Sequence, residues 1–315
     1  MTLTRRQFST SLIALAATLP MANSAWASVS YKTGHYTYEG HGSVNTHWIE
    51  TPNSVIVIDV QRDTTHAAEA IEAIRALGKP VSAILITHGH PDHYVGVHQF
   101  QQVWPGLKVY ASPETTRVIE TDHYGYHEVV RQLTPDEAPE VFVVPDQVFA
   151  DGATLQIDGV TIETHEMGPA EATSTTAFYL PETGDLYPGD LILNDMHGFF
   201  YEERSGLVLD ALNRLRVLFP DAVTAHPGHG SPGPFRPLVD KQEDYTETAR
   251  TLVASALATG LVEGDLVSRV TTQLNATYPS YGIPGGQPNM VELSVMGLAN
   301  ELSALRDGSP TNLEQ

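Results

Sequence analysis

The segment His88-Gly89-His90-Pro91-Asp92-His93 carries four metal-binding side chains on a single short stretch of chain. Imidazole nitrogen and carboxylate oxygen both suit zinc and its first-row neighbours. Gly89 permits a tight backbone path, and Pro91 fixes one backbone angle, so the loop has the preset course that converging ligands need. The spacing therefore predicts a metal site.

Two later segments place further ligand types beside glycine. Asp190 ends the segment Pro188-Gly189-Asp190, and His229 lies within Pro227-Gly228-His229-Gly230. Glycine has no Cβ, so the backbone can approach a metal closely at these points. So many ligand types predict two metal ions that share a bridging carboxylate.

The elements before the first motif explain how it is positioned. Residues 54–60 and 81–87 are apolar runs that predict buried strands, and residues 66–77 between them predict an amphipathic helix that Gly78 and Pro80 end. This order predicts a β-α-β unit with the ligand loop at the carboxyl end of its second strand, where α/β sheets place their sites.

The rest of the chain alternates short strands and helices. Strands are predicted at 107–111, 141–144, 154–157, 160–165, 176–180, 186–193 and 222–224, helices from Pro113 and over 207–219, 238–259, 263–274 and 290–305, and an irregular insertion at 121–140. Two successive blocks of this kind predict a two-sheet sandwich with helices outside. Residues 237–315 are interpreted as a helical extension packed on that core.

The three motifs together resemble those of the metallo-β-lactamase-fold hydrolases. The resemblance rests on residues 88–93 followed by Gly96, on Gly189-Asp190 and on residues 227–230, and it covers roughly residues 40–235. It implies an α/β (α+β) fold, a four-layer αββα sandwich over residues 28–236. It also implies a dinuclear site in the cleft between the sheet edges.

The resemblance implies metal ligands in two sets that share one carboxylate. The first set is His88 and His90, the second is Asp92, His93 and His229, and Asp190 bridges them.

The remaining ligand of the first set departs from the family pattern. Where the family has a histidine, the stretch after Gly168-Pro169 has Glu171, and His165 upstream is the alternative ligand. A carboxylate favours harder ions, so the expected cofactors are two divalent metal ions, zinc first, with manganese or iron as alternatives.

Other residues are assigned lesser roles. His226 is expected to support the ligands, Asp59 to be structural or supporting, and His197 to face the substrate or to be an ordinary hydrogen-bonded histidine. No metal role is expected for His47, His98 or His123. An apolar substrate wall is expected from the aromatic residues Tyr124, Tyr126, Phe199, Phe200 and Tyr201.

These residues predict a metal-dependent hydrolase in which metal-bound hydroxide attacks a lactone, ester, thioester or amide carbonyl. Asp92 is the expected catalytic residue, orienting the hydroxide or carrying its proton. A periplasmic β-lactamase is the alternative, although the chain lacks cysteine and has Asp190, which favours lactonase-like or thioesterase-like enzymes. An iron-dependent oxygenase and a catalytically silent metal-binding protein remain open on the same fold.

The amino-acid composition limits the classes of partner that the protein is expected to bind. The 315 residues include 38 acidic and 17 basic side chains, for a net charge of −21, and no cysteine. Disulfides and thiolate ligands are excluded, and nucleic acid or anionic membrane surfaces are disfavoured. A small-molecule substrate is expected, and the oligomeric state is left open.

The first 27 residues have the pattern of an export signal. Arg5 and Arg6 precede a short apolar stretch that ends at Ala25-Trp26-Ala27. The arginine pair favours twin-arginine export over an ordinary secretory signal, and the stretch is too short for a lasting membrane anchor. The mature protein is therefore expected in the periplasm or outside the cell.

Overall fold

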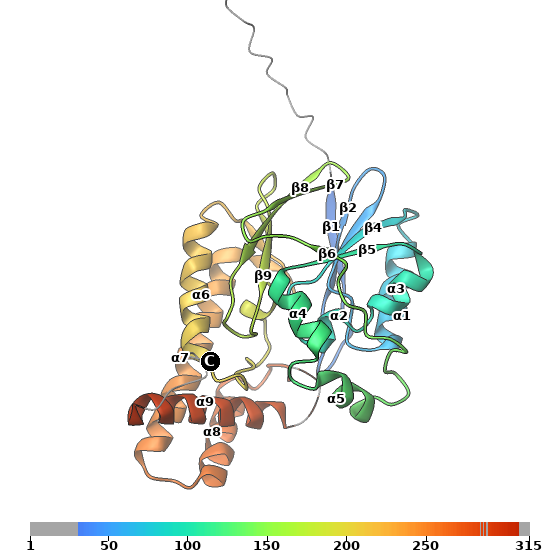
Figure 1. The fold of residues 1–315 in the computed structure, drawn as a ribbon. Helices are drawn as coiled ribbons and strands as arrows, with labels where there is room; N and C mark the ends of the chain where they lie inside the picture. The colour runs from blue at the N-terminus through green and yellow to red at the C-terminus, as the bar shows by residue number, and fades with distance from the viewer. Residues whose placement is uncertain (1–30, 284, 286, 288, 309–315) are drawn as a thin grey trace, which may run out of the picture.

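The computed structural model describes residues 31–283, 285, 287 and 289–308, which form two facing six-stranded sheets with helices outside both (Figure 1). The first sheet contains, in order, β1 Lys32–Tyr36, β2 Thr46–Glu50, β3 Val55–Ile58, β4 Val81–Leu85, β5 Lys108–Ala111 and β6 Gln147–Val148. The second contains β12 Gly233–Pro234, β11 Thr224–Ala225, β10 Asp185–Tyr187, β9 Thr176–Leu180, β8 Val160–Glu166 and β7 Thr154–Ile157. The predicted sandwich is confirmed.

The helices follow the strands in chain order. They are α1 Thr64–Arg75, α2 Pro91–Tyr94, α3 Val97–Val103, α4 Pro113–Thr121, α5 Tyr126–Leu133, α6 Ser205–Leu218, α7 Phe235–Ala258, α8 Glu263–Thr277 and α9 Met290–Asp307, with a 3-10 turn, η1, at Gly189–Leu191. The predicted helix start at Pro113 is confirmed, because the Ser112 side chain accepts a hydrogen bond from the Thr115 backbone N–H.

Strand β3 shows how the layers form, because successive side chains of a strand point to opposite faces. Val55 and Val57 face outward and pack in a cluster with α1 and α3. Ile56 and Ile58 face inward and pack against the other sheet. A strand buried on both faces reads as an unbroken apolar run, which is why its sequence is so easily recognised.

Strand β9 does the same for the second sheet. Phe178 and Leu180 face the first sheet, whereas Ala177 and Tyr179 face outward into the cluster that includes α6 and α7. Helices α8 and α9 contribute to this outer cluster as well. Of the three C-terminal helices, α7 thus lies beside the second sheet, and α8 and α9 lie beyond its lower end in Figure 1. The division at residue 236 stays a prediction.

Three local predictions are wrong. Residues 121–140 are not irregular throughout, since they contain α5. Residues 141–144 form no strand, because Phe142, Val143 and Val144 instead pack their side chains against the first sheet's outer cluster. The strand predicted over 186–193 stops at Tyr187, where the chain turns into η1 with Gly189 at φ 57°.

The predicted export signal at residues 1–27 lies outside the described residues. Among the described residues, no helix is both long enough and apolar enough to cross a membrane.

Candidate functional site

The first motif leaves the end of β4 and enters α2. His90 immediately precedes the helix and Pro91 occupies its first turn, so His93 is carried back toward the sheet edge. Asp59 fixes this arrangement, accepting hydrogen bonds from the Thr87 backbone N–H at 2.9 Å and from His93 Nδ1 at 2.9 Å. This bond leaves His93 Nε2 directed at the cluster, and the predicted supporting role of Asp59 is confirmed.

Asp190 and His229 arrive from neighbouring parallel strands of the second sheet. β10 pairs with β11, and their carboxyl ends lead into η1 and the His229 loop. Gly228 is required between them, because a Cβ on it would lie 1.9 Å from Asp190 Oδ1 and 3.0 Å from His93 Cε1. His47 holds the same loop through a 2.8 Å bond between its Nε2 and the Pro227 carbonyl.

The predicted ligands meet in two adjoining groups. The first is His88, His90, Glu171 and Asp190, and the second is Asp92, His93 and His229, with one ligand atom from each member within 4.8 Å of the others in its group.

Asp190 lies between the two groups. Its Oδ1 is 3.4 Å from His93 Nε2, and its Oδ2 is 3.1 Å from His229 Nε2 and 4.0 Å from His88 Nε2. Asp92 approaches from the other side, with Oδ2 at 3.5 Å from His229 Nε2. This is the arrangement that a bridging carboxylate needs.

Glu171, and not His165, joins the first group. Glu171 is buried, with Oε1 at 3.3 Å from His90 Nδ1 and Oε2 at 3.9 Å from His88 Nε2. His165 lies on β8, pairs with Glu163 at 3.6 Å and contacts the Phe219 ring. The alternative ligand therefore points away from the cluster.

The ligand atoms fit a bound cation. Within the described part of the chain, the buried atoms His88 Nε2, His93 Nε2, Asp190 Oδ1 and Glu171 Oε2 have no hydrogen-bond partner. Buried polar atoms are normally satisfied, so four such atoms facing one another indicate a ligand. Nitrogen and oxygen donors of this kind suit divalent first-row metals.

The electrostatics of the cluster agree with this fit. Burial opposes ionisation of Asp190, but the charges of His229 and His93 hold its pKa well below the usual range. Burial likewise disfavours protonation of His93, yet Asp190 and Asp92 raise its pKa well above the usual value. Burial raises the pKa of Glu171 despite the opposing charge of His90. The carboxylates thus attract positive charge to a buried place, where a metal ion can replace protons.

Glu202 is a further buried carboxylate that the sequence analysis does not identify. Its Oε1 lies 3.0 Å from His90 Nε2, so the two ring nitrogens of His90 face Glu202 and Glu171. Arg204 pairs with Glu202 at 2.5 Å, and the Tyr124 hydroxyl donates to it at 2.9 Å. No local motif in the sequence distinguishes Glu202 from the adjacent Glu203.

His197 takes the second of its two expected roles, and two other expected roles are not observed. His197 is buried and faces the C-terminal helices, with Nδ1 at 3.0 Å from the Tyr245 hydroxyl, so its interpretation as an ordinary hydrogen-bonded histidine holds. His226 supports no ligand, because its Nε2 bonds Asp185 at 2.7 Å and its ring stacks on Tyr187. Tyr124 has its hydroxyl engaged in the Glu202 network and does not line the main cavity.

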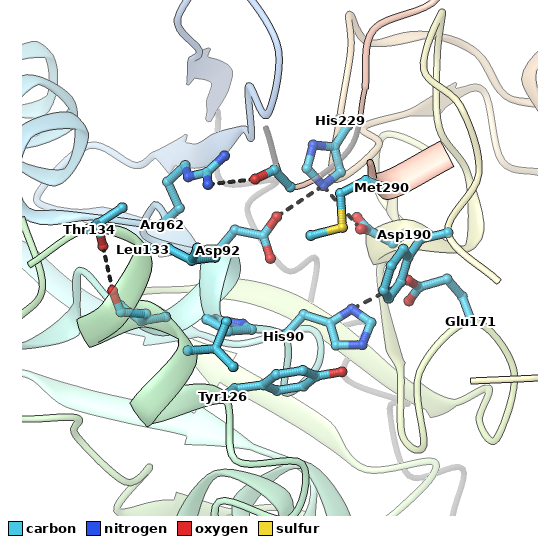
Figure 2. A pocket seen from close by; sticks show the side chains of 15 residues that line it. Arg62, His90, Asp92, Tyr126, Leu133, Thr134, Glu171, Asp190, His229 and Met290 are labelled. Atoms are coloured by element: carbon cyan, nitrogen blue, oxygen red, sulfur yellow. Dashed lines mark hydrogen bonds and ion pairs between the residues drawn. The ribbon is translucent and has the colours of Figure 1, made fainter. Parts of the chain in front are cut away.

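A cavity of about 140 Å³ opens beside the cluster (Figure 2). Its floor includes the ligands His90, Asp92, Glu171, Asp190 and His229, and its sides include Arg62, Tyr126, Phe199 and Met290. Tyr126 and Phe199 thus border the cavity, and their role as a substrate wall stays a prediction. Phe200 is instead buried in the core, and Tyr201 is exposed away from the cavity.

Comparison with known proteins points the same way. The sequence model of the metallo-beta-lactamase superfamily matches residues 40–260. The "lactamase-like protein adaB" of Aspergillus niger is 26% identical over 215 residues, which cover 68% of this chain and 57% of that protein. A "linear primary-alkylsulfatase" of Pseudomonas sp. is 24% identical, with 70% and 49% coverage.

Two further comparisons extend this result. A "hydroxyacylglutathione hydrolase" of Xanthomonas oryzae pv. oryzae is 29% identical over half of each chain. The chain thus spans about half the length of the curated relatives it matches. The solved metallo-beta-lactamase family protein of Thermus thermophilus superposes with a TM-score of 0.64 at 20% identity, covering 87% of this chain and 94% of that one, which shows a shared fold.

Proposed function

The chain belongs to the metallo-beta-lactamase superfamily, and on this premise we propose that it is a metal-dependent hydrolase of small molecules. The bond cleaved is proposed to be a lactone, ester, thioester or amide at its carbonyl carbon. The observation that supports this most is the set of unpartnered buried ligand atoms that face one another beside an open cavity. The relatives' names describe hydrolytic enzymes for several substrates, so they support hydrolysis in general.

The fold and the ligand cluster indicate divalent metal binding, and we propose two ions. His88, His90 and Glu171 would hold one, and Asp92, His93 and His229 the other, with Asp190 shared. Zinc is the first choice, and the carboxylate of Glu171 makes manganese or iron the alternatives. When bound, such ions acidify water and polarise a carbonyl group.

The chain's own groups complete the proposed reaction. Asp190 holds the two ligand groups at a fixed separation through its contacts with His93 and His229. The Asp92 carboxylate faces the cavity and is 17% exposed, so it can accept a proton from water and deliver it to the leaving group. The His93 and His229 contacts hold the pKa of Asp92 below its usual value despite burial, so this carboxylate is ionised at neutral pH.

The test combines elemental analysis of the purified protein with a panel of lactone, ester, thioester and β-lactam substrates. We expect two metals per chain, turnover within the panel, and loss of activity in Asp190→Ala. The exposed Asp210 on α6 provides the control, and Asp210→Ala should retain wild-type activity. Full activity in Asp190→Ala would overturn the bridging role.

The same measurements decide between the remaining functions. Turnover confined to the lactam ring would assign a β-lactamase. One iron per chain with oxygen consumption would replace the hydrolase by an oxygenase. Fewer than two metals with no turnover would indicate a silent binding protein.

We also propose that residues 1–27 direct export, so that the mature enzyme acts in the periplasm or outside the cell. Replacing Arg5 and Arg6 with lysine should keep the protein in the cytoplasm if the twin-arginine route is used. Unchanged export of this variant would favour an ordinary secretory signal.

A further inference from the structure

One wall of the cavity is apolar and comes from a helix that exposes it. Tyr126, Val129, Val130 and Leu133 of α5 all line the cavity. They lie at helical spacing on one face, since residues three, four and seven apart share a side of a helix. Val129 is 43% exposed and Leu133 is 49% exposed, so this face lies open at the cavity.

The polar residues of α5 lie on its other side. Gln132 donates to Glu128 at 2.9 Å, and the Arg131 guanidinium lies over the Phe142 ring. None of these three α5 residues is among those that line the cavity. The apolar face is therefore directed at the cavity by the amphipathic pattern of the helix itself.

Two residues distant in sequence extend the apolar wall. Phe199, which follows η1 in the chain, borders the same space as the ligands Asp190 and His229. Met290, the first residue of α9, borders it as well (Figure 2). Phe199 also contacts the His90 ring edge-on at 5.7 Å. These apolar side chains thus line the same cavity as the ligand cluster.

The wall offers no counter-charge to an anionic group. Arg62 is the single lysine or arginine among the described residues that line the cavity. Its guanidinium donates to the Gly42 carbonyl at 3.2 Å, to the Gly285 carbonyl at 2.6 Å and to the Tyr38 hydroxyl at 3.4 Å. These bonds hold the Arg62 guanidinium at the rim of the cavity and leave few of its N–H groups to bind a substrate anion.

From these observations we infer that the substrate is a carboxylic ester or lactone with an uncharged, apolar chain, which lies along α5, Phe199 and Met290 while its carbonyl group reaches the ligand cluster. This inference deepens the proposed hydrolase and rests on it for the reacting bond. Binding of the substrate's apolar chain to the wall depends only on the shape and chemistry of the cavity, and not on the reaction. An apolar chain is favoured there because each buried methylene contributes about fourfold to binding.

The kinetic test uses p-nitrophenyl acetate, butyrate, hexanoate and octanoate with the metal-loaded protein. We expect kcat/KM to rise about fourfold per methylene until the wall is covered. In Val129→Asp and Leu133→Asp the octanoate-to-acetate ratio of kcat/KM should fall at least tenfold. The control is Leu218→Asp on α6, an apolar residue that is 42% exposed outside the cavity, which should keep the wild-type ratio.

A binding measurement separates this inference from the proposed function. Calorimetric titration with 1-octanol and ethanol compares two uncharged alcohols that differ in the length of their alkyl chain alone. Tighter binding of 1-octanol than of ethanol, weakened in Leu133→Asp, supports the wall even if no ester is hydrolysed, in which case the proposed function fails alone. Equal binding together with a flat chain-length profile overturns the wall and leaves the hydrolase standing. Thermal unfolding of each variant verifies that it is folded.

Discussion

His90 lies between two carboxylates, and this environment distinguishes the first ligand group from the second. Glu171 faces its Nδ1 and Glu202 faces its Nε2. A ligand imidazole that donates its other N–H to a carboxylate is fixed in one tautomer and becomes a stronger donor to metal. The two glutamates therefore have different tasks on one ring, which predicts different consequences when each is changed.

Removing the Glu171 carboxylate should empty part of the first metal site. We expect Glu171→Ala to weaken metal binding on the order of 100-fold, because losing a ligand costs at least as much as losing a supporting partner. Glu171→His should shift the preference from manganese toward zinc. Competitive metal titration with elemental analysis measures both effects. His165→Ala is the matched control, and loss of a metal in that variant, with none in Glu171→Ala, would reverse the assignment.

Glu202→Gln should weaken metal binding about 10- to 100-fold while leaving every proposed ligand in place. The amide retains the shape of the side chain but loses the charge that orients His90. The absorption spectrum of the cobalt-substituted protein should change, a result that a purely structural role would not produce. Glu120→Gln, at an exposed site on α4, should match the wild type. An unaltered spectrum and affinity in Glu202→Gln would contradict the positioning role.

At the scale of elements, the site lies where strands end and the chain turns sharply. β4 delivers the first motif, β10 delivers Asp190, and β11 delivers His229. An isolated bridge between His88 and Thr175 joins the two sheets there, and another bridge pairs Leu193 with His229. Gly228 is a sensitive position in this loop, because a Cβ there would lie 1.9 Å from Asp190 Oδ1.

Gly228→Ala should disrupt the cluster, because its methyl group would occupy the position of Asp190 Oδ1. We expect loss of metal binding and a decrease in unfolding free energy of about 1–3 kcal/mol. Gly264→Ala on α8 is the matched control, since nothing lies within 4 Å of its added Cβ. The control should be neutral or up to about 1 kcal/mol more stable. Thermal unfolding and metal content report on both, and normal metal content in Gly228→Ala would refute the steric argument.

Elements with continuous local signals were predictable from sequence. β3 is fully buried and β4 is buried except at Ser82, so both read as largely apolar runs, and the first motif is confined to one loop. The face of α5 was present as Tyr126, Val130 and Leu133 at helical spacing, but the helix is short and its neighbouring prolines indicate a loop.

Contacts between distant residues were not predictable in this way. Glu202 meets His90 across 112 positions of sequence, and neither residue carries a local mark of that pairing. The choice between Glu171 and His165 as the ligand also required the folded structure, because the two residues are close in sequence. Only the loop after β8 directs one of them, Glu171, toward the cluster.

At the scale of the whole molecule, the C-terminal helices are continuous with the second sheet's core. One apolar cluster joins residues of β9, α6, α7, α8 and α9. The buried Glu301 carboxylate on α9 accepts the Ser205 and Gly206 backbone N–H groups at the start of α6 and pairs with Arg250 at 2.9 Å. The region therefore contributes directly to the stability of the sandwich.

His197 should make that stability sensitive to acid. Burial lowers its pKa from 6.5 to about 4 in the folded protein, so the unfolded chain takes up the proton more readily. The contribution of His197 to the free energy of unfolding is complete above about pH 6.5 and is lost as the pH falls toward 4. This loss is at most about 2 kcal/mol between pH 7 and pH 5.

Urea unfolding at pH 7 and pH 5 measures this difference. In His197→Gln the loss on acidification should be smaller than in the wild type by that contribution. His123→Gln, at an exposed position, should behave as the wild type. An identical acid response in His197→Gln would show that other groups account for it.

The bond from Arg62 to the Gly285 carbonyl, together with Met290 in the cavity wall, has a consequence for how the enzyme matures. The ligand cluster draws its last member from His229, whereas the wall draws on residues that the ribosome adds considerably later. Synthesis must therefore pass Met290 before the cavity wall is complete, and the C-terminal helices that complete it also belong to the core of the second sheet.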